Sequence, residues 1–140
     1  MRTAPHGLLR VAAACPPVRV GDPERNAEAT LQFAADAAQR GVQVLLLPEL
    51  GLTGYTCGDL FFSLETLVGG AERALDRVLR GTAEQAMVLV VGLPVVQRGR
   101  LFNVAAVLHW LTGYYKNGIG RPPVEVFLAG SSAGGYGVLY

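Results

Sequence analysis

Lysine and cysteine are both scarce in this sequence of 140 residues. The chain has one lysine, Lys116, and two cysteines, Cys15 and Cys57. Two cysteines are too few for a disulfide framework or a four-cysteine zinc site, so no metal site is expected and a reduced, cytoplasmic protein is the default expectation. No cysteine follows position 57, so a cysteine nucleophile in the second half of the chain is excluded.

Charge and long apolar runs are scarce as well. Charged residues make up 16% and the formal net charge is +1, so a basic surface for nucleic-acid phosphates is not expected. The longest apolar run, 86–96, contains Gly92 and Pro94 and falls well short of the ~20 residues that span a bilayer, which excludes a membrane partner. The run 8–15 ends in Ala-Ala-Cys, as lipoprotein signals do, but Arg10 interrupts it, which favours a buried first strand.

What the sequence does have is enough apolar content, 51%, to build the core of one domain. Short apolar runs predict buried strands, and the length and β-branching of the run at 42–47 favour a strand buried on both faces. A polar turn at 97–100 joins two of them into a hairpin. The predicted strands are Leu8–Ala14, Val42–Leu47, Ala86–Leu93, Leu101–Leu108 and Val124–Ala129.

Two helices are predicted from apolar residues at helical spacing, Asp22–Arg40 and Gly70–Arg80. Asp22 can cap the first free N–H groups, Pro23 suits the first helical position, and Gly41 suits the left-handed conformation after the helix. The apolar face expected for the first helix consists of Ala27, Leu31, Ala34, Ala35 and Ala38.

A carboxylate, Glu49, follows the predicted strand Val42–Leu47 almost directly. The end of a strand is rigid and the space beyond it commonly forms a crevice, so Glu49 is a candidate general base. From its position alone, a surface glutamate at the start of a loop is the alternative interpretation.

The residues around Glu49 form a specific motif. They read Leu-Pro-Glu-Leu at 47–50, Leu-Thr-Gly-Tyr at 52–55 and Asp-Leu-Phe at 59–61. Further similar segments follow at 90–94 and 101–105. Together they closely resemble the nitrilase-type glutaminase domain of the glutamine-dependent NAD⁺ synthetases, a branch of the carbon-nitrogen hydrolase superfamily.

This resemblance covers residues 1–109 and implies the opening half of an α-β-β-α layered sandwich. It also implies a Glu-Lys-Cys triad that hydrolyses the amide of glutamine. Glu49 matches the base of that triad, and Tyr55 matches a residue close to the substrate amide. The resemblance implies no cofactor for this domain, since ATP and deamido-NAD would belong to a separate synthetase domain, and it implies self-association.

The sequence departs from the triad in two respects. The nucleophilic cysteine of the family belongs well downstream of Glu49, where this chain has none. Cys15 is expected to be a small buried apolar residue, and Cys57 lies in the loop after Glu49, where the family has no nucleophile. Lys116 follows Gly-Tyr-Tyr at nearly the right distance from Glu49 to be the triad lysine. The Pro-Lys context and the Leu-Pro-x-Tyr that should follow it are absent, which favours a solvated loop lysine.

A second candidate nucleophile is Ser132, in the G-x-S-x-G pattern at 130–134 that follows the predicted strand Val124–Ala129. A strand that turns sharply into a helix exposes such a serine. These residues resemble the pectin acetylesterase and Notum family of carboxylester hydrolases. That family's Asp and His follow the serine, whereas His6 and His109 both precede it here, which favours an unactivated hydroxyl in a Gly/Ser-rich turn.

The chain therefore divides into a nitrilase-like partial domain, 1–109, and a loop with a strand-turn-helix segment, 110–140. A synthetic or chimeric sequence, a misassembled reading frame and a truncated natural chain would each explain the combination. Three functions are carried forward: a glutamine amidohydrolase-type domain that is inactive in this chain, a serine carboxylester hydrolase, and a non-catalytic α/β domain. The predicted fold is an incomplete layered α/β sandwich with both helices on one face of a sheet and an apolar opposite face that favours self-association.

Overall fold

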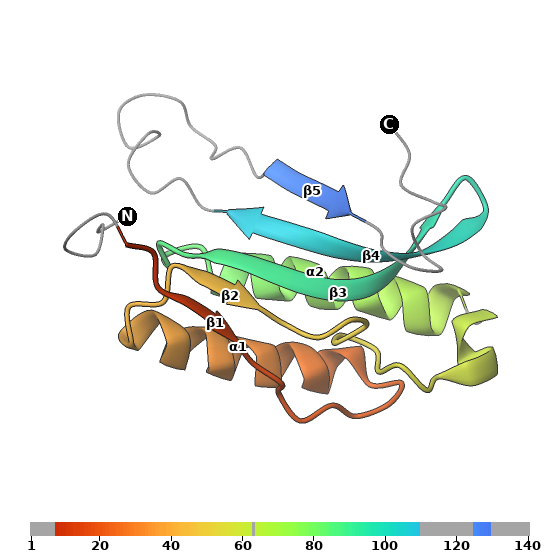
Figure 1. The fold of residues 1–140 in the computed structure, drawn as a ribbon. Helices are drawn as coiled ribbons and strands as arrows, with labels where there is room; N and C mark the ends of the chain where they lie inside the picture. The colour runs from red at the N-terminus through yellow and green to blue at the C-terminus, as the bar shows by residue number, and fades with distance from the viewer. Residues whose placement is uncertain (1–7, 63, 110–124, 130–140) are drawn as a thin grey trace.

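A single mixed β-sheet organises the chain, and its strands lie in the order in which they occur in the sequence (Figure 1). The computed structural model describes residues 8–62, 64–109 and 125–129. The first three strands are parallel to one another, and each of the last two is antiparallel to the strand before it. The strands are β1 (Val11–Ala13), β2 (Val44–Leu46), β3 (Val88–Gln97), β4 (Arg100–His109) and β5 (Glu125–Ala129).

Two helices, α1 (Pro23–Gln39) and α2 (Gly69–Gly81), lie on the same face of the sheet (Figure 1). The start of α1 is as predicted, because Asp22 Oδ1 accepts a hydrogen bond from the Arg25 backbone N–H at 3.2 Å and Pro23 opens the helix. Two short helical segments that the sequence did not predict, a 3₁₀ helix and a π-helix, lead into α2. These are η2 (Gly58–Phe62) and η3 (Leu64–Val68).

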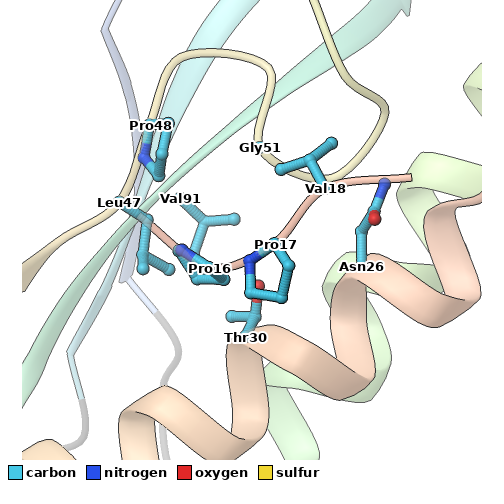
Figure 2. Close-up of a pocket in the computed structure, with 9 residues that line it drawn as sticks. All are labelled: Pro16, Pro17, Val18, Asn26, Thr30, Leu47, Pro48, Gly51 and Val91. Atoms are coloured by element: carbon cyan, nitrogen blue, oxygen red, sulfur yellow. The ribbon is translucent and has the colours of Figure 1, made fainter. Parts of the chain in front are cut away.

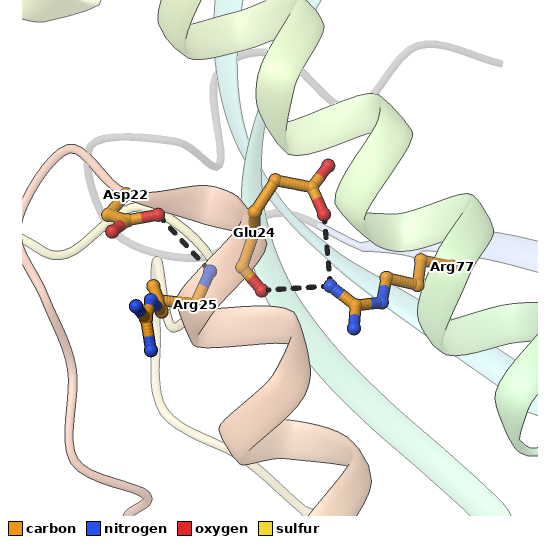
Figure 3. Close-up of polar contacts among 4 residues, drawn as sticks. All are labelled: Asp22, Glu24, Arg25 and Arg77. Atoms are coloured by element: carbon orange, nitrogen blue, oxygen red, sulfur yellow. Dashed lines mark hydrogen bonds and ion pairs between the residues drawn. The ribbon is translucent and has the colours of Figure 1, made fainter.

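Glycines let α2 pack closely against α1. A Cβ placed on Gly81 would lie 2.5 Å from Leu31 Cδ2, and one on Gly70 would lie 3.3 Å from Pro23 Cγ. Between these two contacts, the Arg77 guanidinium pairs with the Glu24 carboxylate at 3.1 Å, as Figure 3 shows. The two helices therefore form one layer over the sheet, joined mainly by small-residue packing and partly by an exposed ion pair.

The core lies between this helical layer and the sheet. Alternate residues of the strands point into it, as expected for a period of two. Each fully buried leucine there contributes roughly 1.5–3 kcal/mol relative to an exposed one. The strand residues in the core include Leu45, Leu89, Val91, Leu93, Phe102, Val104, Ala106 and Leu108.

The opposite face of the sheet is also apolar, and no described helix covers it (Figure 1). Its residues follow from the strand register, which aligns Leu46 with Val90 and Val90 with Val107. Leu46 is 51% exposed, and Val11 on the edge strand is 66% exposed. We call this surface the open face. The predicted arrangement of four strands in one sheet, with both helices on one side and an apolar second side, is confirmed.

The predictions that the first strand is buried and that the strand at 42–47 is buried on both faces are wrong. β1 and β2 are shorter than predicted, and in β2 only Leu45 is buried. Cys15, expected to be buried, is exposed. The physical reason is that an apolar run reflects what a complete sandwich would bury, whereas the described helices cover only one face of this sheet (Figure 1).

The buried face of α1 also differs from the prediction. Ala27 and Ala34 are buried as expected, but Ala35 is exposed, and two polar residues, Asn26 and Thr30, are buried instead. A polar side chain can occupy a buried helical position when the neighbouring backbone satisfies its hydrogen bonds, and apolar periodicity cannot detect this.

The hairpin and the last strand were correctly placed by the sequence. β3 and β4 are joined at Arg98 and Gly99, which have positive φ angles of 50° and 73°, as a tight hairpin turn requires. β5 pairs with β4 and so extends the same sheet. The predicted elbow at 130–132 and the helix after it lie outside the described residues. No helix in the described part of the chain is long and apolar enough to cross a membrane.

Candidate active site

Glu49 lies in a tight turn just after β2. The turn is closed by backbone hydrogen bonds from Gly51 N to Pro48 O at 3.1 Å and from Gly54 N to Leu50 O at 2.7 Å. Leu50, directly after Glu49, has a φ of 50°. A branched residue in the left-handed region costs of order 1–3 kcal/mol and persists only where the surroundings enforce it. The backbone on the C-terminal side of Glu49 is therefore held in one specific conformation.

Gly92, in the middle of β3, makes room for this turn. A Cβ at Gly92 would lie 2.5 Å from the Pro48 carbonyl oxygen, 2.6 Å from the Leu50 nitrogen and 2.9 Å from Glu49 Cα. The Gly92 carbonyl also accepts a hydrogen bond from Leu52 N at 3.2 Å. The turn that carries Glu49 thus lies directly against the backbone of the sheet, which only glycine permits at this position.

Asn103, on β4, contacts the Glu49 side chain. Its Nδ2 donates a short hydrogen bond to Glu49 Oε1. Asn103 pairs with Pro94 and lies two residues from Ala105, the partner of Gly92, so the contact falls on the open face. Glu49 itself is exposed. The carboxylate is therefore fixed in position while remaining accessible.

The turn is anchored from the helical side by Asn26 of α1. Asn26 Nδ2 donates to Leu52 O at 3.0 Å and to Arg19 O at 2.8 Å, while Asn26 Oδ1 accepts from Arg19 N at 2.7 Å. The Gly21 N–H adds a hydrogen bond to Thr53 O at 2.8 Å. The segment before α1 and the turn after β2 are thereby held to one helical side chain.

A small cavity lies beside Asn26, between α1, the segment before α1 and the turn after β2 (Figure 2). Asn26 and Thr30 line it from the helix, and Pro48 and Val91 line it from the turn and the sheet. It has room for about one water molecule. A cavity of this size cannot hold a substrate, so we regard it as a packing gap beside the turn and not as a binding site.

The remaining candidate residues differ in their exposure and in whether the structure describes them. Tyr55 is 70% exposed in the segment that follows the turn. Cys57 is buried, and its Sγ donates to Thr53 O at 3.1 Å and to Gly54 O at 3.3 Å, which fits a structural role. Lys116 and Ser132 lie outside the described residues. Within the described ranges, no three His, Cys, Asp or Glu side chains gather as metal ligands.

The site also contains residues that the sequence did not single out. Asn103, Gly92 and Asn26 position Glu49 or its turn, yet none of them was a candidate. One signal was available: Asn103 is the only polar residue in the otherwise apolar stretch 101–108. A polar residue in such a row needs a partner, and here that partner is Glu49.

Comparison with known proteins decides the family. The family model for carbon-nitrogen hydrolases matches residues 10–118. The chain belongs to the carbon-nitrogen hydrolase family. Within this family, the glutamine-dependent NAD(+) synthetase of Mycobacterium tuberculosis is 36% identical over 104 residues, which is 74% of this chain and 15% of that protein.

Solved structures agree on the fold of this carbon-nitrogen hydrolase. A glutamine-dependent NAD(+) synthetase from Cytophaga hutchinsonii matches with a TM-score of 0.62 and 28% identity, over 72% of this chain and 17% of that one. An amidase from Nesterenkonia sp. matches with a TM-score of 0.63 and 24% identity, over 72% of this chain and 38% of that one; at this identity the likeness concerns the fold alone.

The chain thus spans a small part of each of these relatives, and the similarity is to the N-terminal glutaminase region of the synthetases. The family match extends nine residues past the predicted boundary at 109. The pectin acetylesterase resemblance of the last 30 residues gains no support from these matches.

Proposed function

We propose that this chain supplies the general-base portion of an active site that hydrolyses the side-chain amide of glutamine. The observation that carries the proposal is the placement of Glu49 on the open face. Its side chain is exposed and bonded to Asn103, and its turn packs against Gly92. The family membership and the 36% identity to glutamine-dependent NAD(+) synthetases support glutamine as the substrate.

In this reaction Glu49 takes the proton of a thiol as the sulfur attacks the amide carbonyl carbon. It then returns that proton to the departing nitrogen, which leaves as ammonia, and water releases the acyl group as glutamate. Tyr55 is proposed to lie near the substrate amide, and Lys116 is the candidate for stabilising the oxyanion. The domain needs no cofactor of its own, and ATP and deamido-NAD belong to a synthetase domain.

The thiol in this scheme does not come from Cys57, which is buried and bonded to backbone carbonyls. Cys15 is exposed in the segment before α1, and among the described residues it makes no hydrogen bond to the Glu49 turn. We therefore expect the 140-residue chain by itself to release no ammonia from glutamine, because losing the nucleophile removes most of the rate.

A graft tests the function. Residues 10–109 of this chain replace the equivalent segment of the M. tuberculosis glutamine-dependent NAD(+) synthetase, whose remaining sequence supplies the missing half of the domain. Ammonia release is then measured with glutamine, asparagine and acetamide. We expect release from glutamine, strongly preferred over the other two amides. A folded graft that hydrolyses none of them, or that prefers acetamide, would contradict the proposal.

A further inference from the structure

The hydrogen bond between Asn103 and Glu49 distinguishes the two oxygens of the carboxylate. Asn103 Nδ2 donates to Oε1, and among the described residues no hydrogen bond reaches Oε2. An asparagine amide nitrogen is a donor only, so it can hold a carboxylate oxygen as an acceptor but cannot take a proton from it. Oε1 is thus occupied by the hydrogen bond from Asn103, and Oε2 is available to exchange a proton.

The position of Asn103 is otherwise unfavourable. Its neighbours in the same row of β4 are Leu101, Ala105 and Val107, all apolar, and Asn103 is partly buried on the sheet. A polar amide in an apolar row is destabilising unless a hydrogen bond compensates for its lost hydration. A charged acceptor compensates better than a neutral one, and Glu49 is such an acceptor.

The backbone delivers Glu49 to this amide with little freedom. Gly92 allows the turn to touch the sheet, and the left-handed Leu50 fixes the direction of the chain just after Glu49. Residues 49 and 103 are 54 positions apart in the sequence, so the contact depends on the fold and is not a local one.

We propose that Asn103 is a positioning residue for the general base: it holds Glu49 Oε1 and leaves Oε2 as the oxygen that exchanges the proton. This rests on the proposed function for the meaning of "base", but the hydrogen bond itself can be tested without any turnover. The result for the bond and the result for the glutaminase graft are therefore independent.

The test is a pH titration of the full 140-residue chain by NMR, following the side-chain amide signals of its asparagines. The Asn103 amide signal should shift as Glu49 gains its proton and lose that shift in Glu49→Gln. Asn26 is the internal control, because its amide donates to the backbone carbonyls of Arg19 and Leu52, which do not titrate. Its signal should not change over the same range.

A second comparison separates this role from a purely structural one. In Asn103→Ser, which keeps a polar side chain but shortens it, and in Asn103→Ala, the carboxyl carbon signal of Glu49 should move while the Asn26 amide signal stays in place. A wild-type Asn103 signal that does not follow Glu49, or that still titrates in Glu49→Gln, would overturn the proposal. An unmoved Glu49 signal in both variants would also overturn it.

Discussion

The two faces of the sheet are both largely apolar but have different surroundings. Leu45 and Leu46 are neighbours in β2, yet Leu45 is 1% exposed on the helical side and Leu46 is 51% exposed on the open side. On the helical side, apolar side chains form the core. On the open side, mostly apolar residues surround the polar contact between Glu49 and Asn103. The residues that stabilise the fold and the residues of the proposed active site thus lie on opposite faces of the same sheet.

The largest expected effect concerns association through the open face. An uncovered apolar face of a sheet tends to pair with another surface, so sedimentation at micromolar concentration should show species heavier than 14.8 kDa. Replacing Leu46 and Val90 together by lysine should return the protein to a monomer. A stable wild-type monomer would show that the open face does not drive association.

Two leucine substitutions test the comparison within one strand. Leu45→Ala should lower the free energy of unfolding by about 2–5 kcal/mol, because it leaves a cavity under the helices. Leu46→Ala should change it by no more than about 0.5 kcal/mol, as expected of an exposed position. Denaturant unfolding of both variants measures the difference. Each substitution is made in the chain without the two lysine substitutions, and the protein concentration is kept low. Equal losses would mean that the open face is covered after all.

Gly92 is the point where the turn on the open face touches the sheet. Gly92→Ala should cost about 1–3 kcal/mol, because the added methyl meets backbone atoms that can move only with the whole turn. Gly99→Ala is the matched control: no atom lies within 4 Å of its added Cβ, so only its left-handed backbone is strained. In addition, only the change at Gly92 should displace the Asn103 amide signal; if that signal stays in place, the contact described for the turn is wrong.

The smallest effect is expected at the ion pair between the two helices (Figure 3). Both side chains are exposed, so a double-mutant cycle with Glu24→Gln and Arg77→Gln should give a coupling of about 0.2–1 kcal/mol that falls with added salt. A coupling that salt leaves unchanged would indicate a buried pair, against the observed exposure.

Local signals in the sequence were sufficient for the helices and the hairpin. Asp22 and Pro23 mark the start of α1 because capping and proline geometry act within one turn of helix. The turn at Arg98 and Gly99 was equally local. The position of Glu49 after a strand could also be read directly, and the surrounding motif pointed to the correct family.

The residues that position the Glu49 turn could not be predicted from local sequence signals. No sequence signal indicated the role of Asn26, because its hydrogen bond to Leu52 exists only where the segment before α1 and the turn after β2 meet over the helix. Gly92 looked like a break in an apolar run, although it is the place where the Glu49 turn touches the sheet. These contacts join residues far apart in the sequence, so they depend on the assembled sheet. The roles of Tyr55, Lys116 and Ser132 stay predictions.

The claim that the open face carries the base is tested most directly by one pair of variants in the graft onto the mycobacterial synthetase. Glu49→Gln should lower the rate of ammonia release from glutamine by about 10²–10⁴-fold, the usual contribution of a general base. Glu28→Gln, an equivalent change on the exposed side of α1, should leave the rate unchanged. Equal rates for the two variants would contradict the assignment of Glu49 as the base.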